Sequence, residues 1–170
     1  MTATSTEVAS TKTKAPAWAW IIGTFFGAGF GRPGPGTWAS VATSLLWLGL
    51  ARFADAASLP LIAGITAIAV TLIGIPAATR VARAMGVEDP SQVVIDEVAG
   101  QMIAFIYVPL NWHNVLAALI LFRAFDITKP FPIRRLEHLP EGTGIMLDDV
   151  GAGLYALAVM QVLLHFGVLK

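Results

Sequence analysis

The chain has 170 residues, enough for one domain, and it lacks cysteine, which excludes disulfides, thiolate metal sites and cysteine nucleophiles. Eleven Lys and Arg residues balance eleven Asp and Glu residues, so nucleic acid is not expected as a partner. Hydrophobic residues make up 56% of the chain and the mean hydropathy is +0.71, which is above the range of ordinary soluble domains.

The N-terminal part of the sequence changes character near residue 14. Residues 1–14 are rich in Ser and Thr and are predicted to be a disordered tail, followed by a single membrane-embedded domain at residues 15–170. The charge-free run at 15–31 is short and glycine-rich, so we expect a short interfacial helix and a loop there. It has no convincing Ala-x-Ala site, so a cleaved signal peptide is not expected.

Four longer stretches contain no Asp, Glu, Lys or Arg, and a membrane-spanning helix needs about 20 apolar residues. The sequence therefore predicts an all-α, multi-pass membrane protein with about four transmembrane helices. The stretches are residues 33–51, 56–79, 98–122 and 150–169.

The distribution of basic residues predicts the orientation, because Lys and Arg concentrate on the cytoplasmic side of membrane proteins. With a cytoplasmic N-terminus and short far-side loops near 52–58 and 109–114, nine basic residues fall on the cytoplasmic side or at its boundary and two on the other. The glycine loop 27–37 and the segments 80–97 and 126–149 then share the cytoplasmic face.

The first acidic motif is Asp96-Glu97, followed by Gln101 four residues after Glu97 on the same predicted helix face. Asp89-Pro90 is typical of a helix start, which would place the acidic pair nearly two turns into a helix. Carboxylate and amide oxygens suit Mg²⁺ or Mn²⁺. The alternative is a solvated acidic turn at a helix start.

The second motif contains Arg123, Asp126 and Lys129, and Pro130 is expected to end its helix. The Arg fork and the Lys ammonium fit a phosphate, while Asp126 can bind a metal or orient the arginine. The alternative is a salt bridge that anchors the end of the helix.

The third motif, at 142–149, leads through glycines to Asp148 and Asp149. At least one metal ligand is expected there, and helix capping is the alternative.

The fourth motif is the glycine- and proline-rich loop at 29–40, which contains Arg32 and Thr37. Its backbone N–H groups can hold an anion at a helix start. The ending of a Walker A loop is missing, and a simple interfacial turn capped by Thr37 is an equal alternative.

Together these motifs resemble the phosphatidylglycerophosphatase A family. The matching pieces are Pro35-Gly36-Thr37 with Ser40, Asp96-Glu97-x-x-Gly100-Gln101, Phe122-Arg123-x-Phe125-Asp126-x-x-Lys129-Pro130-x-Pro132 and Gly144-Ile145-Met146-x-Asp148-Asp149-x-x-Ala152-Gly153. They occur in family order over about residues 20–155. Arg32 stands where a proline is expected, and Ala39 replaces a usual glycine.

The resemblance implies a Mg²⁺-dependent enzyme of the bacterial inner membrane that hydrolyses phosphatidylglycerophosphate in the cytoplasmic leaflet, with its active site facing the cytoplasm. It implies three groups of site residues. The metal ligands are Asp96, Glu97, Asp126, Asp148 and Asp149; the catalytic carboxylates are Glu97, Asp126 and Asp149; the phosphate contacts are Arg123, Lys129, Arg32 and Thr37.

Several alternatives stay open at this point. Hydrolysis by a metal-activated water, with Asp126 or Asp149 as base, is preferred to a phospho-aspartyl intermediate. The number of ions, the oligomeric state and the head-group selectivity are not specified. A transporter would place its acids near the bilayer midplane, and a CDP-lipid phosphotransferase would need an Asp-Gly-x-x-Ala-Arg motif that the sequence lacks.

Overall fold

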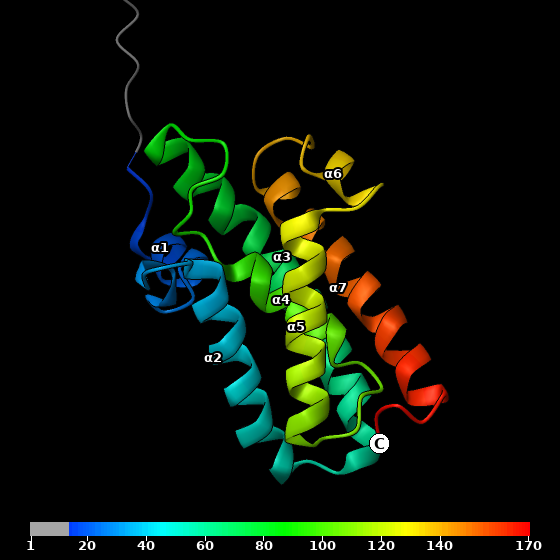
Figure 1. Cartoon of the computed structure of the whole chain (residues 1–170). Coiled ribbons are helices and arrows are strands. Elements are labelled where there is room, and N and C mark those ends of the chain that lie inside the picture. Colours follow the sequence, from blue (N-terminus) through cyan, green and yellow to red (C-terminus); the bar gives the residue numbers. More distant parts are fainter. Residues whose placement is uncertain (1–13) are drawn as a thin grey trace, which may run out of the picture.

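The computed structural model describes residues 14–170, so the predicted tail lies outside the described part except for Lys14. Within that part the chain forms seven α-helices, three short 3-10 helices and no strand, which confirms the predicted all-α fold (Figure 1). In chain order the elements are α1 (Ala17–Gly23), η1 (Ala28–Phe30), α2 (Pro35–Leu50), η2 (Ala51–Phe53), η3 (Ala56–Ser58), α3 (Leu59–Met85), α4 (Ile95–Ala104), α5 (Trp112–Thr128), α6 (Ile133–Leu136) and α7 (Gly142–His165).

The short helix α4 lies at the centre of the bundle and packs against α2, α3, α5 and α7 (Figure 1). Every residue of α4 except Glu97 is buried, as expected for a mostly apolar helix with neighbours on all sides. Two of the buried residues, Asp96 and Gln101, are polar. Since a buried polar group is costly unless it has a partner, these two side chains point to a function for the centre of the bundle.

Two glycines allow α4 and α7 to approach closely. A Cβ added to Gly153 would meet the backbone of Gly100, and a Cβ on Gly100 would meet the Asp149 carbonyl oxygen and the Phe122 ring. Small residues at such a crossing let two helix backbones come together. The contact places residues 149–153 of α7 beside α4.

The loops form two groups at opposite ends of the bundle. Asn111 and Asn114 donate hydrogen bonds of 2.7 and 2.8 Å to the Lys170 carbonyl oxygen, so the C-terminus lies beside the α4–α5 loop. In Figure 1 this end is below, with the α2–α3 connection, while α6 lies at the upper end. The α2–α3 and α4–α5 connections thus lie at the end of the bundle opposite α6.

The count of four spans needs correction. Two segments, Ala56–Met85 and Gly142–His165, are long and apolar enough to cross a membrane, whereas α2 and α5 have only 16 and 17 residues. At 1.5 Å per residue these two helices extend about 25 Å, less than a hydrocarbon core of ~30 Å. The stretch 98–122 is not one helix, because α4 ends at Ala104 and α5 begins only at Trp112.

The two long segments carry much of their apolar surface on the outside of the protein. Only 28% and 39% of their most apolar windows are buried. Leu61, Ile65 and Ile68 on α3 are 65%, 58% and 62% exposed. The core helix of a soluble protein would be largely buried, so this exposed apolar surface favours contact with lipid.

The predicted helix start at Asp89-Pro90 is wrong, because both residues lie in the loop 86–94. The Val94 N–H donates to the Gly23 carbonyl oxygen at 2.8 Å, which ties this loop to the end of α1. A tertiary contact thus prevails over the local capping signal. The acidic pair lies in the first turn of α4 and not deeper in the helix.

Candidate active site

Three carboxylates converge where the start of α4 meets α7. One oxygen from each of Asp96, Glu97 and Asp149 lies within 4.8 Å of the other two. Asp96 and Glu97 belong to the first turn of α4, where the helix dipole favours negative charge. We call these three residues the acid triad.

The acid triad has little positive charge around it. Within residues 14–170, Asp96 and Asp149 make no ion pair, and Glu97 Oε1 lies 3.6 Å from Arg123 Nη1. Burial raises the pKa of Asp96 well above its ordinary value, and the charges of Glu97 and Asp149 raise it further. Burial also raises the pKa of Glu97, although Asp96 and Arg123 act against that shift. The site therefore stabilises added protons or an added cation.

The donor atoms of the acid triad fit a hard divalent cation. Asp96 Oδ1, Glu97 Oε2 and Asp149 Oδ2 are buried and have no hydrogen-bond partner among the described residues. Carboxylate oxygens without histidine or cysteine suit Mg²⁺ better than zinc or copper.

Arg123 joins the acid triad to Asp126. Its Nη1 lies 2.6 Å from Asp126 Oδ2, one turn further along α5, and its side chain is 18% exposed. Its Nε is buried without a hydrogen-bond partner in the described part of the chain. Arg123 can thus neutralise two carboxylates and still offer a donor to an anion.

Asp148, the neighbour of Asp149, is paired with Lys129. Lys129 Nζ donates to Asp148 Oδ2 at 2.6 Å and to Glu137 Oε1 at 2.8 Å. Burial acts to lower the pKa of Lys129, but the two carboxylates outweigh it and the pKa is raised. Lys129 follows the last turn of α5 with a left-handed backbone (φ 41°), next to Pro130, which ends the helix as predicted.

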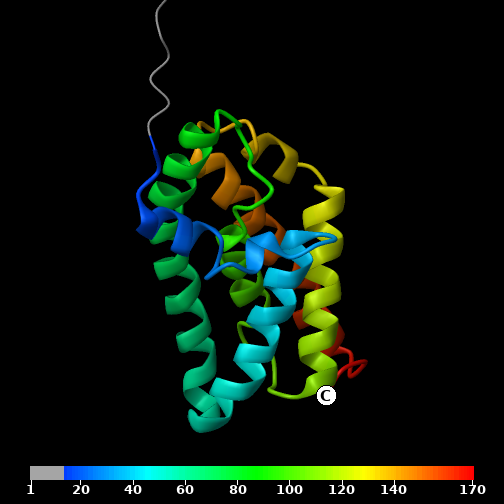
Figure 2. The same cartoon turned by 90° about the vertical axis from the view of Figure 1, so that its left-hand side faces the viewer.

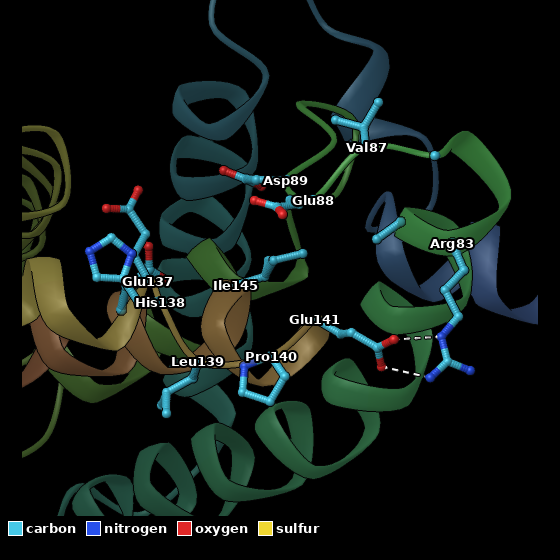
Figure 3. A pocket seen from close by; sticks show the side chains of 13 residues that line it. Arg83, Val87, Glu88, Asp89, Glu137, His138, Leu139, Pro140, Glu141 and Ile145 are labelled. Atoms are coloured by element: carbon cyan, nitrogen blue, oxygen red, sulfur yellow. Dashed lines mark hydrogen bonds and ion pairs between the residues drawn. The ribbon is translucent and has the colours of Figure 1, made fainter.

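A cavity of about 910 Å³ opens beside Asp148 at the end of the bundle that carries the site. Its wall consists of the end of α3, the following loop, the segment before α7 and the first two turns of α7 (Figure 3). Arg83 and Glu141 form a bidentate ion pair across it, with distances of 2.7 and 2.8 Å. Glu88, Asp89 and Glu137 add negative charge. The cavity gives water and ions access to the Asp148 side of the site.

The glycine loop reaches the acid triad through Gly36. A Cβ at Gly36 would collide with Glu97 Oε1 and lie 3.0 Å from Arg123 Nη1. Arg32 and Thr37 are exposed, and Arg32 makes no ion pair within the described residues. Their contacts with a phosphate stay a prediction.

We expect Gly36→Ala to lower activity about 10²-fold, because displacing an active-site group by ~1 Å can have that effect. The added methyl group must move Glu97 or Arg123. Gly49→Ala on the same helix is the matched control, since a Cβ there meets nothing within 4 Å. Phosphate release and thermal melting of both purified variants check this. Full activity of Gly36→Ala would show that the position of Glu97 is not critical.

Gln101 is a further polar residue at the site that the predicted ligand set omitted. It is fully buried, and neither its Oε1 nor its Nε2 has a partner within residues 14–170. Its spacing of four residues from Glu97 was a visible signal, since both lie on one face of α4. Its amide is available to a ligand that enters from the acid triad.

A sequence model of the family described as Phosphatidylglycerophosphatase A matches residues 21–164. The chain belongs to the phosphatidylglycerophosphatase A family. It is therefore an enzyme of the phosphatidylglycerophosphatase class, and the resemblance seen in the four motifs is confirmed.

Three curated relatives cover most of the chain. A phosphatidylglycerophosphatase A from Haemophilus influenzae is 39% identical over 142 residues, 82% of this chain and 85% of its own length. The Escherichia coli protein of that name is 33% identical over 149 residues, 85% of this chain and 83% of its own. A Bacteroides thetaiotaomicron protein, provisionally named a phosphatidylinositol-3-phosphatase, is 39% identical over 145 residues, 84% of this chain and 91% of its own. No solved structure matches the chain significantly.

Proposed function

We propose that the protein hydrolyses phosphatidylglycerophosphate to phosphatidylglycerol and phosphate in phospholipid biosynthesis. The observation that carries this proposal is the acid triad, which combines three unpartnered buried oxygens with Arg123 at 3.6 Å. A site with cation ligands and a guanidinium suits a phosphate monoester, which carries negative charge on three oxygens.

We propose Mg²⁺ as the cofactor, held by Asp96, Glu97 and Asp149. When bound, the ion would neutralise the phosphate and lower the pKa of water. Asp126 and Asp148 are adjacent ligand candidates, but each is engaged by a cation, Asp126 by Arg123 and Asp148 by Lys129.

The remaining residues are proposed to bind the phosphate and to move a proton. Arg123 would donate to the phosphate from its free Nε, and Asp126 would hold the guanidinium in place. Asp126 or Asp149 would accept the proton from the attacking water. Lys129 would add positive charge for the phosphate from the side of Asp148, and its ammonium also donates to Glu137.

We propose that the enzyme sits in the bacterial inner membrane with this end of the bundle toward the cytoplasm. The last turns of α3 carry Arg80 and Arg83, and α6 at the same end carries Arg134 and Arg135. The opposite end has Arg52 in η2 and the C-terminal Lys170. The substrate's acyl chains would stay in the cytoplasmic leaflet while its phosphate reaches the acid triad.

The direct test is phosphate release from phosphatidylglycerophosphate by the detergent-solubilised protein. We expect activity with Mg²⁺, its loss after EDTA treatment, and its return on adding Mg²⁺, because three buried carboxylates need a counterion. Added Mg²⁺ should also raise the melting temperature of the metal-free protein. Full activity after exhaustive chelation would rule out the metal, and absence of activity under all conditions would rule out the reaction.

A second candidate substrate is phosphatidylinositol 3-phosphate, because the Bacteroides relative that bears that activity in its name is 39% identical. Both lipids carry a phosphate monoester, so the acid triad and Arg123 could serve either. Comparing kcat/KM for the two lipids under identical conditions decides between them, and a higher value for the inositol lipid would replace the first proposal.

A further inference from the structure

A second cavity lies between α2 and α3, separate from the cavity beside Asp148. It measures about 320 Å³, and its lining includes Leu46 and Leu50 of α2, Ile62 and Val70 of α3, and Val98 and Met102 of α4. Figure 2 shows α2 and α3 diverging upward from their connection, with α4 behind them. We call this cavity the lateral groove.

The lateral groove is suited to hydrocarbon. Only two of its lining residues, Thr43 and Thr66, carry a hydroxyl group, and the Thr43 hydroxyl already donates to the Ala39 carbonyl oxygen at 2.8 Å. No charged side chain contributes to the wall. Most of the wall is hydrocarbon, so an apolar occupant would gain the hydrophobic effect.

One wall of the groove belongs to the helix that carries two residues of the acid triad. Val98 directly follows Glu97 on α4, and Met102 lies one turn further from the site on the same helix. At the other end of the groove the lining includes Leu50 and Leu59, near the connection of α2 and α3. A molecule whose phosphate lay at the acid triad would thus have the groove leading away from it along the bundle.

The groove follows the half of α3 next to the α2–α3 connection. From Leu59 to Val70 its wall covers twelve residues of α3, which at 1.5 Å for each of eleven rises is ~16 Å. Residues that flank the groove, such as Leu45 at 63% exposed and Ile65 at 58%, are apolar and face outward. A lipid chain could therefore enter sideways from the membrane.

We propose that the lateral groove binds one acyl chain of the lipid substrate and thereby directs its phosphate to the acid triad. This inference rests on the proposed lipid phosphatase function and adds where and how the substrate is held. It predicts that the enzyme prefers long-chain lipids to short-chain lipids with the same head group.

The test fills the groove and compares two substrates. Leu46→Trp places a large ring on the wall, while Leu45→Trp, on the neighbouring exposed position outside the groove, is the matched control. The readout is the ratio of kcat/KM for dioleoyl to that for dihexanoyl phosphatidylglycerophosphate in detergent micelles. We expect this ratio to fall about tenfold in Leu46→Trp, as for the loss of contact with one or two methylene groups, and to stay unchanged in Leu45→Trp. An unchanged ratio in Leu46→Trp, or an equal fall in both variants, would overturn the proposal.

A second measurement does not depend on turnover. A phosphatidic acid with a diazirine on one acyl chain is photolysed with the purified protein, and the labelled residues are mapped by mass spectrometry. Labels at Leu46, Ile62 and Met102 support the groove, whereas labels spread equally over Leu45 and Ile65 show only bulk lipid. Groove labelling without phosphate release would contradict the proposed function and leave the binding site supported.

Discussion

Asp149→Asn is expected to lower kcat by roughly 10³-fold or more and to remove the stabilisation by Mg²⁺, because the proposed ion loses one of three ligands. The substitution of the neighbouring residue, Asp148→Asn, is expected to lower kcat less and to keep the stabilisation by Mg²⁺. The two variants differ because Asp149 belongs to the acid triad, whereas Asp148 is paired with Lys129 at 2.6 Å. Phosphate release and melting curves with and without Mg²⁺ check both variants.

The two variants should also change stability in opposite directions when Mg²⁺ is absent. Asp149 has an unpartnered buried oxygen, so its replacement by Asn removes an uncompensated charge and should raise the melting temperature. Asp148→Asn breaks a short ion pair and leaves Lys129 with Glu137 as its one carboxylate partner among the described residues. The melting temperature of this variant should therefore fall. The reverse pattern, with Mg²⁺ stabilisation lost in Asp148→Asn and kept in Asp149→Asn, would move the ion to the Lys129 side.

The helix content and the ends of several helices follow directly from local sequence. Pro130 ends α5, and the tryptophan-rich segment after residue 14 forms the short helix α1. The sequence did not show that the stretch 98–122 divides into the end of α4 and the start of α5. A run of apolar residues has the same composition whether it faces lipid or protein. Here α4 is enclosed by four helices, which lets a ten-residue helix stay apolar without crossing a membrane.

In the candidate site, too, local sequence identified residues but not the partners that the packing of the helices gives them. The sequence marked all five carboxylates and both cations, since charges are scarce in so apolar a chain. It could not distinguish Asp148 from Asp149, because adjacent residues on a helix point about 100° apart and only the packing of α5 and α7 decides which side chain meets which partner. It also could not show that Gly36 touches Glu97, since this contact arises where α2 and α4 approach in space.

Arg123→Lys is expected to lower kcat/KM by roughly 10–150-fold, the equivalent of one charge-assisted hydrogen bond. A Lys ammonium can neutralise Glu97 and Asp126, but it cannot reproduce the planar fork of the guanidinium. The Arg123 Nε, buried without a partner among the described residues, is the donor we expect to meet the phosphate. The kcat/KM of Arg123→Lys measures the loss of catalysis, and its melting curve shows whether the variant is still folded.

The alternative role of Arg123 is to neutralise its neighbouring carboxylates, and the structure makes this a serious competitor because Nη1 lies 2.6 Å from Asp126 Oδ2. In that case Arg123→Ala should destabilise the protein, and adding Asp126→Ala should restore the melting temperature, since the partner charge is then gone. If Arg123 instead acts on the phosphate, the double variant stays inactive and Arg123→Lys stays folded but slow. Near-normal activity of Arg123→Lys would show that charge alone is needed at this position.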